Sequence, residues 1–123
     1  MIFGLFLLCA RPADADCVDE SSRMFGLPVS LALAVLEVEG GKIGSANLNK
    51  NGTRDYGPAQ VNSVHMEKLA RFGITEDDLM FNYCLNVHAA LYIIRKHYDS
   101  LPENMEISAR LAEAAGRYHS KTP

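Results

Sequence analysis

The sequence predicts a mainly α-helical domain with one small β-hairpin lobe. Most of the chain consists of segments with apolar residues at helical spacing, separated by capping and stop residues. Residues 40–58 differ, because they gather Gly, Asn and Pro around Asn51-Gly52, a strong hairpin signal. Strand-like segments are too few for a sheet core, and 123 residues suit one domain.

An apolar run at the N-terminus predicts a secretory signal peptide over residues 1–15. Residues 2–9 are mostly apolar, and residues 13–15, Ala-Asp-Ala, have the small-x-small pattern of a cleavage site. A lipoprotein signal centred on Cys9 is the alternative, but the residues before it are not small. We therefore expect an exported domain over residues 16–123.

The cysteine count predicts a disulfide in the mature chain. Loss of the signal peptide removes Cys9 and leaves Cys17 and Cys84. An even number of cysteines in an oxidising compartment favours a Cys17–Cys84 bond. Two buried free thiols are the alternative.

The charge and histidine patterns indicate neither a nucleic-acid partner nor a metal site. The formal net charge is -3 and no basic tract is present, so a nucleic-acid partner is not expected. The four histidines are scattered along the chain without ligand spacing, so no metal site is expected.

Two helices are expected before the hairpin. Residues 16–26 form the first and residues 28–39 the second. Pro28 suits a first helical turn, and Gly40 with the next glycine suits a C-terminal stop. This second helix has almost no polar face, so we expect it to lie inside the core.

Further helices are expected after the hairpin. Three of them are expected over 62–71, 75–80 and 86–98, with Asn62 or Ser63, Thr75 and Asn86 as their capping residues. A last, Ala-rich helix is expected to start at Ser108 or earlier and to run to about residue 119. In the first of them, Val64, Leu69 and Phe72 are expected to contact the core.

Glu39 and Asp55 form the candidate catalytic pair. Glu39 stands in the last turn of its helix, where the helix dipole and apolar neighbours favour the protonated acid. A general acid needs that form, although such a residue alone is more often a solvated helix end. Asp55 lies sixteen residues later on the far arm of the hairpin. Glycoside hydrolysis uses two carboxyls in different environments, but spacing alone is weak evidence.

Several segments carry a family resemblance in the same order. Residues 49–63, NKNGTRDYGPAQVNS, resemble a segment shared by c-type lysozymes and soluble lytic transglycosylase (SLT) domains, with Glu39 at the position of the acid. Residues 84–86 and 117–123, CLN and RYHSKTP, resemble two later motifs. The resemblance covers nearly all of residues 17–123. The most similar subgroup is the small periplasmic transglycosylases of type IV secretion, conjugation and related envelope-spanning machines.

The resemblance implies a lysozyme-like fold with the hairpin lobe beside an active-site cleft, and no cofactor. It implies that Glu39 first protonates the bond between N-acetylmuramic acid (MurNAc) and N-acetylglucosamine (GlcNAc), and then acts as the base that closes a 1,6-anhydro ring. Asp55 is the possible second carboxylate. The implied substrate-binding residues are Tyr56, Gln60, Asn62 and Tyr118, the last with its hydroxyl toward the acid. The implied partners are peptidoglycan glycan strands and components of a secretion or conjugation machine in the periplasm.

Two other functions stay open. One is a lysozyme-type hydrolase that uses Asp55 as nucleophile or ion stabiliser. The other is a glycan-binding or assembly module without useful activity. Related domains usually continue past the last motif, so we expect this domain to be shortened at its C-terminus, which motivates the second alternative.

Overall fold

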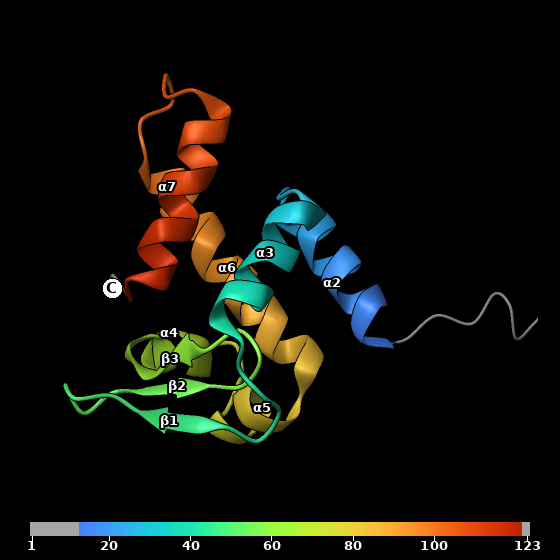
Figure 1. Cartoon of the computed structure of the whole chain (residues 1–123), viewed down its shortest axis with the longest axis vertical. Coiled ribbons are helices and arrows are strands. Elements are labelled where there is room, and N and C mark those ends of the chain that lie inside the picture. Colours follow the sequence, from blue (N-terminus) through green and yellow to red (C-terminus); the bar gives the residue numbers. More distant parts are fainter. Residues whose placement is uncertain (1–12, 122–123) are drawn as a thin grey trace, which may run out of the picture.

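The computed structural model describes residues 13–121, so most of the predicted signal peptide lies outside the described residues. The helices are α2 (Ala13–Met24), α3 (Val29–Glu39), α4 (Met66–Ala70), α5 (Glu76–Phe81), α6 (Tyr83–Ser100) and α7 (Ile107–His119). The sheet and a short 3-10 helix are β1 (Ala46–Leu48), β2 (Arg54–Tyr56), β3 (Val61–Asn62) and η1 (Ser63–His65). The predicted fold class is confirmed: helices dominate, and a small antiparallel sheet lies beside them (Figure 1).

Helix α6 is the centre of the helical lobe. It contacts α2, α5, α7 and β3, and most of its apolar residues are buried. It begins after Asn82, whose side chain accepts a hydrogen bond from the Leu85 N–H at 3.1 Å. The prediction that Asn86 caps this helix is wrong, because Asn86 lies inside its first turns and is fully buried. Two cap-type asparagines stand four residues apart, and only the packing distinguishes them.

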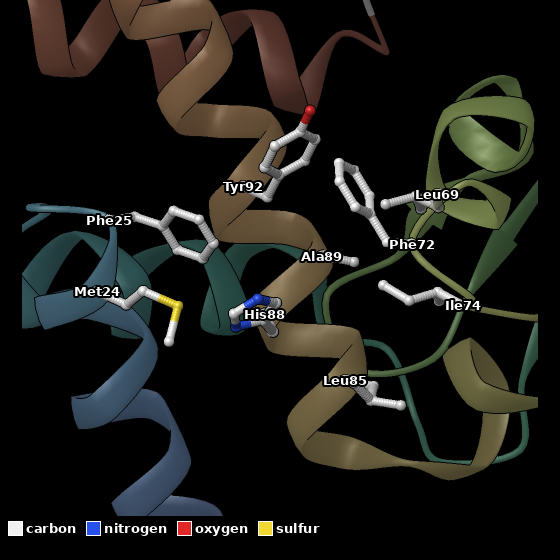
Figure 2. A pocket seen from close by; sticks show the side chains of 9 residues that line it. All are labelled: Met24, Phe25, Leu69, Phe72, Ile74, Leu85, His88, Ala89 and Tyr92. Atoms are coloured by element: carbon white, nitrogen blue, oxygen red, sulfur yellow. The ribbon is translucent and has the colours of Figure 1, made fainter.

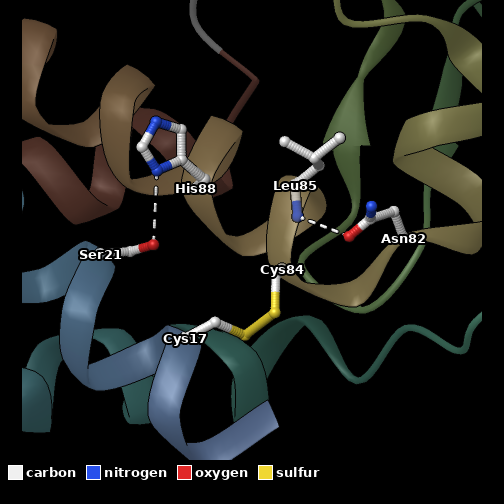
Figure 3. Close-up of a disulfide and its surroundings, with 6 residues drawn as sticks. All are labelled: Cys17, Ser21, Asn82, Cys84, Leu85 and His88. Carbon is white, nitrogen blue, oxygen red and sulfur yellow. Dashed lines mark hydrogen bonds between the residues drawn. A yellow bond between two sulfur atoms is a disulfide. The ribbon is translucent and has the colours of Figure 1, made fainter. Parts of the chain in front are cut away.

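A disulfide joins α2 to the start of α6. The predicted Cys17–Cys84 bond is confirmed, with the two Cα atoms 5.5 Å apart across a sequence separation of 67 (Figure 3). One helical turn further on, Ser21 Oγ and His88 Nδ1 lie 3.4 Å apart. The N-terminal helix is therefore fixed to the central one by a covalent bond.

Helix α3 begins and ends where the sequence predicted, but it is less buried than expected. Pro28 precedes it, and Gly40 closes it with a left-handed φ of 59° and an N–H bond to the Leu36 carbonyl. The prediction of a fully buried helix is wrong, because Leu33 and Val38 are 54% and 65% exposed. One face of α3 packs on α2 and α7, and the other has no partner among the described residues.

The small sheet has three antiparallel strands in the order β1-β2-β3. Its first pair is the predicted hairpin, with Asn51-Gly52 in the turn and Asn47 opposite Asp55. On the other side of β2, Asp55 pairs with Asn62. The third strand was not predicted, because two residues are too short for a periodic signal.

Asn86 fixes the sheet to the helices. Its Nδ2 donates to the carbonyls of Tyr56 and Leu79, each at 2.8 Å, and its Oδ1 accepts from the Ala59 N–H at 2.8 Å. The turn that follows β2 is thereby held against α6 and α5. Such a buried amide satisfies backbone groups that would otherwise be unpaired.

Gly41 brings the end of α3 onto the same turn. Its N–H donates to the Pro58 carbonyl at 3.1 Å, and a Cβ at this position would overlap the Gly57 carbonyl oxygen. Only glycine allows this approach. The last turn of α3 consequently lies beside β2.

Two predicted core contacts after β3 are wrong. Leu69 is buried as expected, but Val64 and Phe72 are exposed.

Among the described residues, no single helix has the length and apolar character to cross a membrane, and α2 and α3 meet these criteria only as a pair bent by 119°.

Candidate active site

Glu39 and Asp55 meet at the junction of α3 and β2. Lys121 joins them, because its Nζ lies 3.2 Å from Glu39 Oε1 and 3.8 Å from Asp55 Oδ1. The side chains of the two acids are only 6% and 12% exposed. The structure therefore brings together the two carboxyls that the sequence proposed as a pair.

Both oxygens of Glu39 have partners from the end of α7 and the turn after it. Oε1 accepts from Lys121 Nζ, and Oε2 lies 2.8 Å from His119 Nδ1. A nearby ammonium favours the carboxylate, and so does an imidazole when it is protonated. The acid therefore has basic side chains at both oxygens, which the helix end alone did not indicate.

Asn62 positions Asp55. Its Nδ2 donates to Asp55 Oδ1 at 2.9 Å and to Thr53 Oγ1 at 3.1 Å. Its Oδ1 accepts from the Val64 N–H and caps η1. Both ends of the amide are used within the protein, so this residue orients a carboxylate here, whereas the sequence suggested a glycan contact.

Gln60 has a similar internal role. It adopts a left-handed φ of 54°, uncommon for a residue with a side chain, at the end of the turn after β2. Its Nε2 donates to the Gly57 carbonyl at 2.9 Å, and its Oε1 accepts from Asn47 Nδ2 at 3.1 Å. Its backbone carbonyl accepts from Lys121 Nζ at 3.0 Å. The main chain of Gln60 thus takes part in the site directly.

Tyr118 lies beneath the carboxyl pair. Its hydroxyl donates to the Ala59 carbonyl at 2.6 Å and lies close enough to Glu39 and Asp55 to interact with their charges. Burial raises the pKa of Tyr118 well above its usual value, and the charges of Glu39 and Asp55 raise it further. The hydroxyl is therefore neutral and serves as a donor.

Tyr56 lies in the core and not on a cleft wall. Its side chain is almost completely buried. Burial, followed by the charge of Glu76, raises the pKa of its hydroxyl. The expected glycan contact of Tyr56 would require this side chain to leave the core.

A groove of about 260 Å³ runs between α3 and α7 and ends at the acid. Glu39 and His119 lie on its wall. Its other lining residues are apolar or small: Leu31, Ala34, Val35, Val38, Ala115, Gly116 and Tyr118. The groove gives the acid an open, largely apolar approach on the side of His119.

A larger pocket lies elsewhere and lacks carboxyl groups. It has a volume of about 350 Å³ and is lined by residues 24 and 25 at the end of α2, by residues of α6 and by the segment 69–74 (Figure 2). Its walls are mostly apolar and aromatic, with His88 among them. Burial lowers the pKa of His88, which favours a neutral ring. This pocket contains none of the predicted site residues.

Lys121 and His119 were not predicted as parts of the site. They lie 82 and 80 residues from Glu39 in sequence, so no local spacing could indicate the contacts.

Within residues 13–121, no group of three His, Cys, Asp or Glu side chains could hold a metal ion.

A helical lobe, a small antiparallel sheet and paired carboxyls at their junction define a lysozyme-like domain. The sequence profile described as Transglycosylase SLT domain matches residues 16–121, and the chain belongs to this family. The resemblance seen in the sequence is thereby confirmed.

Three relatives show how much of the chain is shared. Protein IpgF of Shigella flexneri is 37% identical over 123 residues, which cover 98% of this chain and 76% of IpgF. Invasion protein IagB of Salmonella typhimurium (strain SL1344) is 32% identical over 122 residues, or 98% of this chain and 72% of IagB. A peptidoglycan-binding-like protein of Escherichia coli O157:H7 is 34% identical over 107 residues, or 79% and 64% of the two chains.

Proposed function

We propose that this domain is a peptidoglycan lytic transglycosylase that cleaves the β-1,4 bond between MurNAc and GlcNAc. The observation that carries the proposal is the placement of Glu39, a nearly buried carboxyl at the end of a groove, in a chain of the SLT family. The similarity to a peptidoglycan-binding-like protein supports the substrate.

One carboxyl can perform both steps of this reaction. Protonated Glu39 gives its proton to the glycosidic oxygen as the bond from that oxygen to C1 of MurNAc breaks. The resulting carboxylate takes the proton of the MurNAc 6-hydroxyl, and O6 bonds to C1. Glu39 ends protonated, no water is consumed, and the products together have the composition of the substrate.

The environment of Asp55 favours this route over hydrolysis. A lysozyme-type enzyme would use Asp55 as nucleophile or ion stabiliser. Here a hydrogen bond from Asn62 and the nearby Lys121 ammonium stabilise the Asp55 carboxylate, which makes it a weaker nucleophile. The third function, a binding module, is favoured by the occupation of both Glu39 oxygens.

The mass of the released muropeptides tests the reaction. The purified protein is incubated with sacculi, and lytic cleavage gives anhydromuropeptides, two hydrogens and one oxygen lighter than hydrolysed ends. Glu39→Gln should lower the rate by about 100-fold or more. Glu37→Gln is the matched control, because Glu37 is exposed two residues earlier on α3 and should keep wild-type activity. Asp55→Asn should retain appreciable activity.

Each alternative has its own signature in these experiments. Release of reducing ends alone would make the lytic route wrong. A loss in Asp55→Asn as deep as that in Glu39→Gln would favour the lysozyme mechanism. Equal wall clearance by Glu39→Gln and wild type would leave a binding role.

We place this activity in the periplasm, beside an envelope-spanning secretion or conjugation machine. The predicted signal peptide and the Cys17–Cys84 disulfide support export to an oxidising compartment. The similarity to an invasion protein supports a role alongside such a machine. Cell fractionation tests the location, and a cytoplasmic pool of reduced protein would contradict it.

A further inference from the structure

We propose that Lys121 is a positioning residue that anchors one oxygen of Glu39 and neutralises Asp55, so that the other Glu39 oxygen faces the glycan. This rests on the proposed function and assigns a role within the same site. The residue lies inside the segment 117–123 that carries the family resemblance, but the sequence analysis predicted no role for it.

The ammonium of Lys121 is held from three sides. Its Nζ lies 3.0 Å from the Gln60 carbonyl, 3.2 Å from Glu39 Oε1 and 3.8 Å from Asp55 Oδ1. The first two contacts are hydrogen bonds, and the third is an ion pair that is too long for one. The same nitrogen lies 5.3 Å from the centre of the Tyr118 ring. The side chain is only 24% exposed, so these contacts are partly shielded from water.

The backbone conformation of Lys121 also fixes the position of its side chain. Its φ is +61°, in the left-handed region that residues with side chains seldom occupy. Its N–H donates to the Tyr118 carbonyl at 3.1 Å, which turns the chain back after α7. This turn is what directs the side chain at the carboxyl pair.

The two basic side chains that contact Glu39 differ in how easily a substrate can displace them. His119 is 64% exposed and meets Glu39 Oε2 at the mouth of the groove. Lys121 is shielded and has the Gln60 carbonyl as a further anchor. A glycosidic oxygen can therefore replace His119 at Oε2 while Lys121 stays at Oε1. A protonated carboxyl keeps one carbonyl oxygen as an acceptor, so the anchor persists in both protonation states.

Among the described residues, Lys121 is the one lysine or arginine that forms an ion pair with Glu39. His65 packs nearby, but its pKa is lowered to about 4, first by burial and then by His97, Lys121 and Lys68, so it stays neutral. The Tyr118 hydroxyl is neutral, and His119 adds charge only when protonated. The Lys121 ammonium consequently lies where it can stabilise the negative charge that develops on Glu39 when the acid gives up its proton.

Two substitutions of Lys121 in the full chain test the role. Lys121→Met should lower kcat on sacculi by about tenfold, because the acid loses its anchor. A general acid works only while protonated, so activity falls at alkaline pH. Removing the ammonium takes a positive charge away from the acid, so this alkaline limb of the rate profile should move to higher pH. Lys121→Arg should restore both the rate and the limb.

Lys96→Met is the control for loss of one lysine. Lys96 is exposed on α6, and it makes no ion pair with the residues that the structure describes. Its rate and pH profile should match wild type. A Lys121→Met protein with wild-type rate and pH profile would overturn the proposal. An arginine variant as impaired as the methionine variant would also overturn it, since the role is assigned to charge.

A second readout separates this proposal from the proposed function. The carboxyl of Glu39 can be followed by NMR in protein with ¹³C-labelled glutamate at one fixed pH, with Glu39→Gln used to assign the signal. Its chemical shift should change in Lys121→Met and not in Lys96→Met, whether or not the wild type releases anhydromuropeptides, because only Lys121 contacts this carboxyl. An unchanged signal in Lys121→Met would show that Lys121 does not act on Glu39, even in an active enzyme.

Discussion

Replacing Asn86 with alanine should destabilise the domain by about 3–5 kcal/mol. Its fully buried side chain makes three hydrogen bonds of 2.8 Å to backbone groups. The substitution leaves the Ala59 N–H and the carbonyls of Tyr56 and Leu79 without this partner. Each such buried group costs about 1–3 kcal/mol, and some relaxation of the turn recovers part of the sum.

Equilibrium urea denaturation of the oxidised protein measures this cost. Asn82→Ala is the matched control, because Asn82 makes one exposed capping bond at the start of the same helix. Its loss should cost only about 1 kcal/mol. Asn86→Asp tests the chemistry, since it keeps the shape and, when ionised, removes both donated hydrogen bonds. If Asn86→Ala costs no more than Asn82→Ala, the buried amide does not hold the sheet as described.

Two further predictions concern stability. Replacing both Cys17 and Cys84 with serine should lower the free energy of unfolding by about 4 kcal/mol in the chain-entropy model, since the bond closes a separation of 67 residues; an unchanged urea midpoint would argue against that contribution. The pKa of His65 falls from 6.5 in the unfolded chain to about 4 on folding, so between these pH values only the unfolded chain binds a proton here. The free energy of unfolding should therefore be unaffected by His65 above pH 6.5 and should fall by about 2 kcal/mol as pH decreases toward 4, after allowance for partial exposure. His65→Gln should weaken this pH dependence of the urea midpoint, and equal pH dependence in both proteins would contradict it.

Local signals in the sequence determined where most elements begin and end. Pro28 and Gly40 bound α3, Thr75 caps α5, and Asn51-Gly52 turns the hairpin. These features depend on contacts within about four residues, which the sequence shows directly. The family motif similarly placed Glu39 and Asp55 on adjoining elements, because its residues are close together in the chain.

The tertiary structure alone decided which faces are buried and which distant residues join the site. Leu33 and Val38 are exposed because α3 has partners on one face only, which composition cannot show. Asn86 and Asn82 are equally good cap formers in the sequence. Packing buries Asn86, where its side chain binds backbone groups of the β lobe, and leaves Asn82 as the cap of α6. Lys121 reaches Glu39 across 82 residues. The contact exists only because α3 and α7 both end toward the small sheet (Figure 1), where each is hydrogen-bonded to the turn after β2.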